Sequence, residues 1–156
     1  MGLQHQVLNL RSGRYDHYFL CHYRPVRSGN DELSRSLIQF KWGNATHVRA
    51  WTSCAIAELV KIPFPQNIFL IRALGHNELS ATKSSVSPVE QLCRKIAEAS
   101  DISYMPSLLG KSRVTRKISL LSLEERKLEL DEVYSFNMPT HLNAERLLIV
   151  DDILTS

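Results

Sequence analysis

The stretch Arg146–Ser156 reads RLLIVDDILTS, and it decides the fold class. Four apolar residues, Leu147–Val150, run directly into two adjacent acids, Asp151 and Asp152. A short, continuous apolar run is typical of a strand that is buried on both faces of a parallel sheet. In such sheets, ligands bind beyond the carboxyl ends of the strands. The stretch therefore predicts a buried strand that delivers two carboxylates to a ligand-binding edge.

The residues that follow the two acids suit a phosphate group. Thr155 and Ser156 carry small hydroxyl side chains, and a tight turn here would point backbone amides and hydroxyls at an anion. The carboxylates of Asp151 and Asp152 would bind vicinal ribose hydroxyls, or a metal ion held by a pyrophosphate. A strand end without a ligand is the alternative, because apolar strands ending in two acids are common in α/β proteins.

Outside this stretch, the chain alternates predicted strands with predicted helices. Helices are predicted after the cap Asp31, from about Thr46, from Pro88 behind the cap Ser87, and after the capping box that Ser122 opens. Strands are predicted at residues 15–23, 67–71, 104–109, 133–136 and 146–150, and the first 14 residues form either a frayed start or an edge strand. This order predicts an α/β fold with a mainly parallel central sheet flanked by helices.

Length and composition indicate one globular domain. A chain of 156 residues, of which 44% are hydrophobic and 22% charged, can bury a substantial core, so we expect a single domain over residues 1–156. The net charge of +3 fits an anionic small molecule, and it gives weak support to nucleic-acid contact.

Cysteine and histidine spacing predicts no metal site built by the protein itself. The three cysteines include no CxxC pair, and the six histidines show no HxxxH or HExxH spacing. No leader precedes the domain and no apolar run has the length of a bilayer span, so we expect a cytoplasmic protein with no membrane partner.

Leu147–Ser156 resembles the signature that binds 5-phosphoribosyl-1-pyrophosphate (PRPP) in type I phosphoribosyltransferases. That signature is a hydrophobic quartet, two acids, two aliphatic residues, Thr or Ser residues and a glycine, and all ten positions here fit. The glycine would follow Ser156, so the domain is expected to be incomplete at its C-terminal end. Three upstream segments occur in the order found in the competence-protein-F-like branch, and a fourth, Leu37–Gly43, resembles an early segment of that branch. The three are Lys111–Lys117, Leu121–Arg126 and Tyr134–Phe136.

The resemblance implies a phosphoribosyltransferase-like fold that takes PRPP and an unknown base or other nucleophile, with Mg²⁺ bridged through the PRPP oxygens. Asp151 and Asp152 would be the catalytic residues, binding ribose hydroxyls and stabilising positive charge at the anomeric carbon. The remaining substrate-binding residues would be Thr155 and Ser156 at the 5-phosphate, Arg72, Ala73, Leu74 and Gly75 at the diphosphate, and Lys83 as a lid cation. A solvated loop lysine is the alternative for Lys83.

The sequence also departs from the family pattern. The Pro-Val-Pro and Arg-Gly-Phe-Asn-Gln stretches of the family are absent, with Ile71–Asn77 in their place, and Lys117 stands near an expected glutamine. Enzymatic activity is therefore left open. The alternative function is a non-catalytic module that binds PRPP or a nucleotide and is linked to DNA uptake or defence. A third option is nucleic-acid binding by the basic segment Lys111–Lys117, and a homodimer is also left open.

Overall fold

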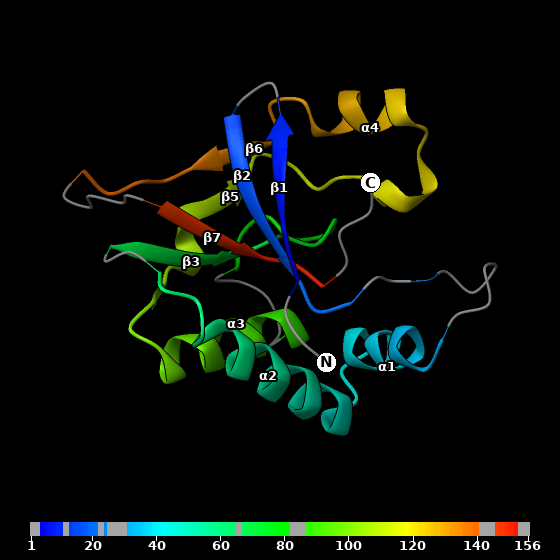
Figure 1. Ribbon diagram of the computed structural model, residues 1–156. Coiled ribbons are helices and arrows are strands. Elements are labelled where there is room, and N and C mark those ends of the chain that lie inside the picture. The colour runs from blue at the N-terminus through cyan, green and yellow to red at the C-terminus, as the bar shows by residue number, and fades with distance from the viewer. Residues whose placement is uncertain are drawn as a thin grey trace. The chain divides into compact units, whose positions relative to one another are not determined.

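The structure is a computed structural model, and it divides into two compact units. The first comprises Met1–Pro63 with Asp152–Ser156, and the second comprises Phe64–Asp151. The described residues are 4–10, 13–21, 24, 31–64, 67–81, 87–140 and 146–152. A single domain over residues 1–156 stays a prediction. Both units are drawn in Figure 1.

The first unit begins with a β-hairpin. β1 (Gln4–Leu10) pairs antiparallel with β2 (Gly13–Phe19). Across the two strands the ring of His5 stacks on that of Tyr18, with 4.8 Å between the ring centroids. Residues 4–10 therefore form a strand, which is one of the two predicted outcomes for the start of the chain. The strand predicted at residues 15–23 is also present, but it begins and ends a few residues earlier.

Two helices complete the first unit. α1 (Glu32–Lys41) begins after Asp31, whose side chain caps it as predicted. α2 (Ala45–Leu59) begins after Asn44, whose side chain accepts hydrogen bonds from two backbone amides of the first turn. Gly43 stands between the helices at φ 80°, a left-handed conformation that glycine adopts without steric cost. Both predicted helices are confirmed.

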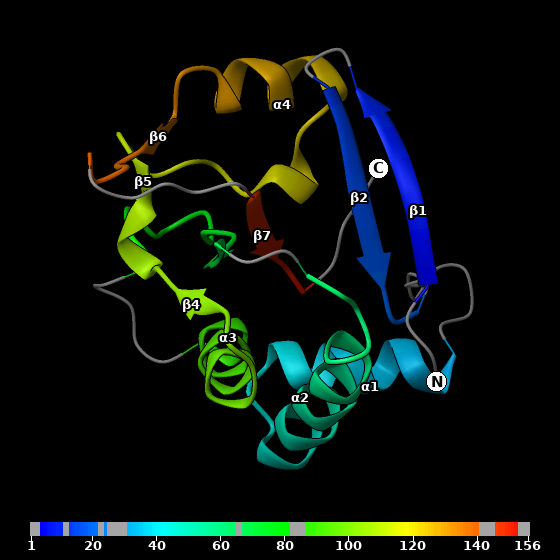
Figure 2. The same ribbon diagram turned by 60° about the vertical axis from the view of Figure 1, so that its left-hand side comes forward.

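The second unit contains a three-stranded parallel sheet, with a strand order of β4-β3-β7. The central strand β3 (Ile68–Arg72) is buried along most of its length, as its apolar run predicts. α3 (Pro88–Ala99) lies between β3 and β4 (Ser103–Tyr104) in the chain and packs against both strands. Figure 2 shows α3 next to β4. The prediction of a mixed α/β fold with parallel strands is confirmed.

β7 (Arg146–Val150) is present over the predicted residues, but the prediction that it is buried on both faces is wrong. It lies at an edge of the three-stranded sheet, with β3 as its strand neighbour. Side chains alternate between the two faces of a strand, so Leu147 and Ile149 share one face. These two side chains are 38% and 56% exposed. The apolar run identified the strand correctly, but not its place in the sheet.

The strand predicted at residues 104–109 is divided into three parts. β4 ends at Tyr104, the 3₁₀ helix η3 (Pro106–Leu108) follows, and β5 (Leu109–Lys111) comes next. Pro106 lacks a backbone N–H and fixes φ, which suits the first position of a helical turn better than a strand interior. β5 pairs antiparallel with β6 (Tyr134–Phe136), which confirms the predicted extended segment.

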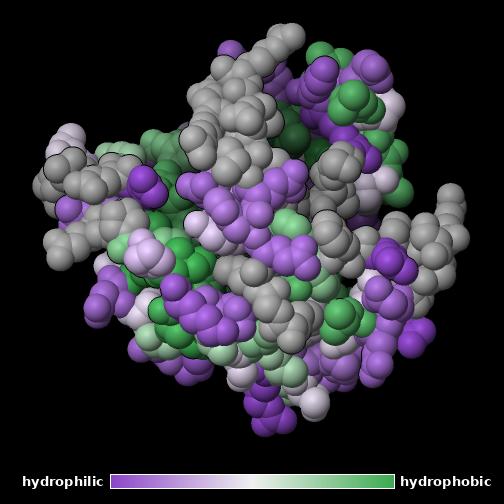
Figure 3. Space-filling model, viewed as in Figure 1, coloured by the Kyte–Doolittle hydropathy of each residue, from purple (hydrophilic) through white to green (hydrophobic). Residues whose placement is uncertain are grey.

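The helix α4 (Leu123–Leu130) begins at the predicted capping box of Ser122 and Glu125, and it follows the 3₁₀ helix η4 (Ile118–Leu120). None of its residues is buried, and Leu128 is 74% exposed. On the face shown in Figure 3, hydrophobic and hydrophilic side chains are intermixed. α4 is the last of four α-helices in the residues that the structure describes.

One core cluster of the second unit lies around the carboxyl end of β3. Ile71 is completely buried and belongs to one cluster with Leu74, Ala81, Leu108 and Leu109. Phe69 and Met105 pack against this cluster. The segment that follows β3 is therefore fixed by packing at Leu74 and Ala81, although the sequence between them is polar.

The cap of α3 gives a stability prediction. The Ser87 Oγ atom accepts a hydrogen bond from the Glu90 amide at 3.1 Å, so Ser87→Ala should lower the free energy of unfolding by about 1 kcal/mol. Both tryptophans, Trp42 and Trp51, lie in the first unit, so their fluorescence would not report on α3 in the second unit. Urea unfolding should therefore be followed by far-ultraviolet circular dichroism. Ser119→Ala is the control, and an equal loss there would argue against the cap.

Candidate functional site

The two segments that the sequence singles out leave neighbouring strands side by side. Arg72 at the end of β3 stands opposite Val150 at the end of β7. One residue further on, the Ala73 N–H donates a hydrogen bond to the Val150 carbonyl oxygen at 2.9 Å. We call Arg72–Gly75 together with Val150 and Asp151 the β3–β7 edge. All its residues belong to the second unit.

The strand order changes direction at this edge. From β3 the chain passes through α3 to β4 on one side of the sheet, whereas β7 lies on the other side of β3. Ligands of open α/β sheets bind outside the carboxyl ends of the strands at such a change of direction. The topology therefore favours the same place as the sequence motifs.

Arg72 is buried, although it was predicted to bind a diphosphate. Its side chain is 2% exposed, and Nη1 and Nη2 donate hydrogen bonds to the two carboxylate oxygens of Glu78 at 2.7 and 2.9 Å. Nε donates to Glu90 Oε2 at 2.7 Å. Burial alone would lower the pKa of Arg72, but the hydrogen bonds to the two carboxylates raise it above its ordinary value. Arg72 is thus a fixed cation between two acids.

Glu90 anchors this arginine from α3. Tyr104 donates its hydroxyl proton to Glu90 Oε2 at 2.6 Å, and Arg94 Nη2 lies 2.8 Å from Oε1 without hydrogen-bond geometry. Burial would raise the pKa of Glu90, but the bonds from Tyr104 and Arg72 lower it. Sequence reasoning missed this residue. Glu90 lies one helical turn before Cys93, on the buried face of α3. A carboxylate at such a position needs a buried cation as its partner, and this requirement could have identified Glu90.

Gly75 presents its amide to the same carboxylate that Arg72 binds. The Gly75 N–H donates to Glu78 Oε2 at 2.7 Å, and the Glu78 N–H donates to the Gly75 carbonyl oxygen at 3.1 Å. A Cβ atom at position 75 would lie only 3.3 Å from Glu78 Oε2. Of the four predicted diphosphate residues, Arg72 and Gly75 therefore converge on one place, and the carboxylate of Glu78 occupies it. The other two do not, because the Ala73 amide bonds to Val150 and Leu74 is buried in the core cluster.

Lys111 is a second buried cation beside this loop. It is 8% exposed, and its Nζ atom donates hydrogen bonds to the Gly75 carbonyl oxygen at 2.8 Å and to Thr115 Oγ1 at 3.3 Å. Burial lowers its pKa, and the charge of Glu78 acts in the opposite direction. Among the residues that the structure describes, no carboxylate lies within ion-pair distance of Lys111. Its position beside Gly75 was not predicted.

Tyr134 lies beside Lys111 and is affected by the charge of Asp151. Lys111 Nζ lies 5.4 Å from the centroid of the Tyr134 ring, which is a cation–π arrangement. Burial raises the pKa of Tyr134, and the negative charge of Asp151 adds to the increase. Asp151 itself is exposed at the end of β7. The side chain of this predicted catalytic residue is thus accessible to a ligand.

The other predicted site residues belong to the first unit or lie outside the described residues. Asp152 accepts a hydrogen bond from Lys41 Nζ at 3.2 Å, so its carboxylate pairs with α1 in the first unit. Lys83, Thr155 and Ser156 are outside the described residues. Their predicted roles at the lid and at the 5-phosphate stay predictions.

The arginines of the basic segment face α4. Arg113 and Arg116 each donate side-chain hydrogen bonds to the carboxylate of Glu129, at 3.0 and 2.8 Å. The hydrogen bonds from Arg116, with a further one from Arg113, lower the pKa of Glu129 to about 2. Much of the positive charge available for nucleic-acid contact is therefore balanced within the unit.

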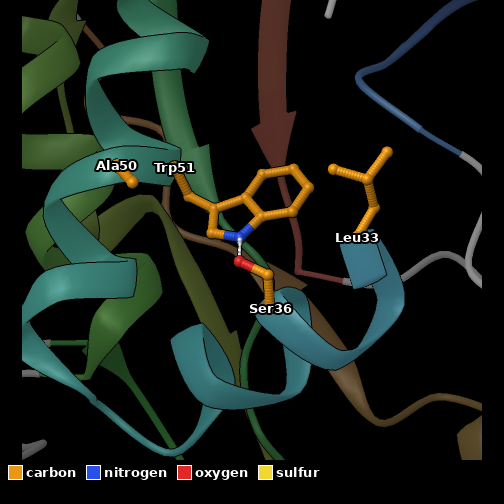
Figure 4. A pocket seen from close by; sticks show the side chains of 4 residues that line it. All are labelled: Leu33, Ser36, Ala50 and Trp51. Carbon is orange, nitrogen blue, oxygen red and sulfur yellow. Dashed lines mark hydrogen bonds between the residues drawn. The ribbon is translucent and has the colours of Figure 1, made fainter. Parts of the chain in front are cut away.

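A shallow pocket in the first unit contains none of the predicted site residues. It is lined by Leu33, Ser36, Ala50 and Trp51, and it offers about 180 Å³ (Figure 4). Trp51 Nε1 donates to Ser36 Oγ at 3.1 Å, and Ser36 Oγ lies 2.7 Å from Nδ1 of His47. These bonds tie α1 to α2.

Comparisons of the chain with protein-family models, curated proteins and solved structures find no match. Within the described residues, no helix is both long enough and apolar enough to cross a membrane. The same residues contain no group of three or more His, Cys, Asp or Glu side chains arranged to hold a metal ion.

Proposed function

We propose that the β3–β7 edge binds PRPP together with Mg²⁺, and that the protein transfers or senses the phosphoribosyl group. The observation that carries this proposal is the pairing of Arg72 with Val150, which places two separately identified segments at adjacent carboxyl ends. Parallel strands that end together at a change of strand order form the usual ligand site of an open α/β sheet.

Each group at the edge suits one part of PRPP. The exposed carboxylate of Asp151 would accept hydrogen bonds from the ribose hydroxyls, and Asp152 would add a second carboxylate if it released Lys41. Thr155 and Ser156 would begin the loop around the 5-phosphate. The diphosphate would lie toward Gly75 and Lys111, where buried positive charge is present.

Mg²⁺ fits this arrangement as an ion that is bound mainly through the substrate. Magnesium sites commonly combine one or two carboxylates with the phosphate oxygens of the ligand. Asp151 supplies a carboxylate at the edge, and the diphosphate of PRPP would supply the other oxygens. The ion would neutralise charge on the diphosphate.

One observation favours sensing over transfer. In a transferase, the leaving diphosphate needs donors that stabilise its developing charge. Here Arg72 and the Gly75 amide already bind the carboxylate of Glu78. A non-catalytic module that binds PRPP or a nucleotide is therefore the second candidate function.

The direct test is calorimetric titration of the protein with PRPP and Mg²⁺. Asp151→Asn should weaken binding by about tenfold or more, because a charged acceptor of hydrogen bonds from the ribose is lost. Asp101→Asn is the matched control, since Asp101 is an exposed aspartate of the same unit. No heat with the unmodified protein, or an equal effect of both substitutions, would exclude the proposal.

A second assay separates transfer from sensing. The protein is incubated with PRPP, Mg²⁺ and a panel of purine and pyrimidine bases, and released pyrophosphate is measured. Release that depends on a base and on Asp151 indicates a transferase. Binding of PRPP without any release indicates a sensor.

A further inference from the structure

The carboxylate of Glu78 lies in a set of donors suited to an oxyanion. The Arg72 guanidinium donates a bidentate pair of hydrogen bonds to the two carboxylate oxygens of Glu78, and the Gly75 amide donates to one of these oxygens at 2.7 Å. Arginine forks and backbone amides are the groups that proteins use to bind phosphates. The anion present in this cradle belongs to the protein itself.

The charges around the cradle favour the binding of an external anion. Arg72 has a second carboxylate partner in Glu90, which is 3% exposed and would keep Arg72 paired if Glu78 moved away. Lys111, 8% exposed, has only neutral partners among the described residues, namely the Gly75 carbonyl oxygen, Thr115 and the Tyr134 ring. The charge of Glu78 acts on Lys111 only in part against its burial, and an anionic ligand would offset the cost of that burial further.

Glu78 can leave the cradle more readily than Arg72 can. Its side chain is 20% exposed, against 2% for Arg72, and it lies in the polar loop after β3. Exchange of Glu78 for a ligand anion would leave Arg72 and the Gly75 amide hydrogen-bonded throughout. The transition is thus a swap of one anion for another, without an unpaired buried charge in its end state.

We infer that Arg72, Gly75 and Lys111 form an oxyanion site that Glu78 closes from within, and that the diphosphate group of a ligand opens it by displacing this carboxylate. This inference rests on the proposed function, because it describes how the same edge is regulated. Glu78 then determines which anions can bind. A ligand with a single negative charge competes poorly with a tethered carboxylate, whereas a diphosphate with Mg²⁺ competes well.

The test compares the binding of inorganic pyrophosphate, with Mg²⁺, by the unmodified protein and by Glu78→Gln. Glutamine keeps the size of the side chain but removes its charge, so pyrophosphate should bind about tenfold tighter or more, because a competing like charge has been removed. Glu129→Gln is the matched control, because Glu129 also pairs with arginines in the same unit but lies outside the cradle. It should bind pyrophosphate as the unmodified protein does.

Equal affinity of Glu78→Gln and the unmodified protein would overturn the inference, as would an equal gain in Glu129→Gln. If Glu78→Gln does not fold, Glu78→Asp decides, because the shorter carboxylate keeps its charge but cannot hold both Arg72 and Gly75. A several-fold gain in pyrophosphate affinity is then expected, and no gain would overturn the inference. If PRPP binding depends on Asp151 but Glu78→Gln does not bind pyrophosphate more tightly, the inference fails and the proposed function stands. If Glu78→Gln binds pyrophosphate more tightly but the protein does not bind PRPP, the proposed function fails and the oxyanion site stands.

Discussion

Replacement of Arg72 by methionine should lower the free energy of unfolding by about 3–5 kcal/mol, because removal of one partner of a buried ion pair leaves the other charge uncompensated. Arg72 is 2% exposed and pairs with both Glu78 and Glu90. Methionine fills much of the same volume, so the decrease in the free energy of unfolding would come mainly from the carboxylates of Glu78 and Glu90, which would lose their cation. Urea unfolding followed by circular dichroism measures it.

Arg113→Met is the control for this substitution. Arg113 also forms an ion pair, with Glu129, but its side chain is 48% exposed. Exposed ion pairs contribute little, so the loss should stay below about 1 kcal/mol. Similar losses at Arg72 and Arg113 would mean that the Arg72 network does not behave as a buried one.

Truncation of Ile71 to alanine should cost about 2–5 kcal/mol, because it leaves a cavity in a packed core. Ile71 is completely buried in the central strand and belongs to the cluster that holds Leu74. Its loss should also loosen the segment Arg72–Gly75. Denaturant unfolding measures the stability, and hydrogen exchange at the Gly75 amide measures the loosening.

Ile149→Ala is a closely matched control, because Ile149 is the partner of Ile71 in the register between β3 and β7. The two residues share type, strand geometry and depth along the sheet, but Ile149 is 56% exposed. A loss below about 1 kcal/mol is expected there. An equal cost at both positions would show that β7 is buried in solution.

Local sequence signals located most of the elements. Asp31, Ser87 and Ser122 each mark the start of a helix because their side chains satisfy a free backbone amide, an effect that needs no distant partner. The burial of β7 was misjudged for the opposite reason. An apolar run indicates a strand that tends to be buried, but it does not indicate the position of that strand in the sheet. The order of strands depends on contacts between residues that are remote in the sequence.

The candidate site divides in the same way. The meeting of Arg72 with Val150 follows from two apolar runs and the rule that parallel strands present their carboxyl ends together. The placing of Glu78 against Arg72 has no such signal, because Glu78 lies in a polar stretch without periodicity. Lys111 appeared as one member of a basic segment, and only the antiparallel pairing of β5 with β6 fixes it beneath Tyr134.

The pairing of β3 with β7 also bears on how the chain folds during synthesis. β3 receives β4 soon after α3 has been made, but β7 is made only after β5, α4 and β6. Until then one side of β3 lacks its neighbour, and closing so large a loop makes the final step slow. Nascent chains are therefore expected to expose this side of β3 until β7 has been made, and an unpaired strand edge of this kind favours aggregation or binding by chaperones.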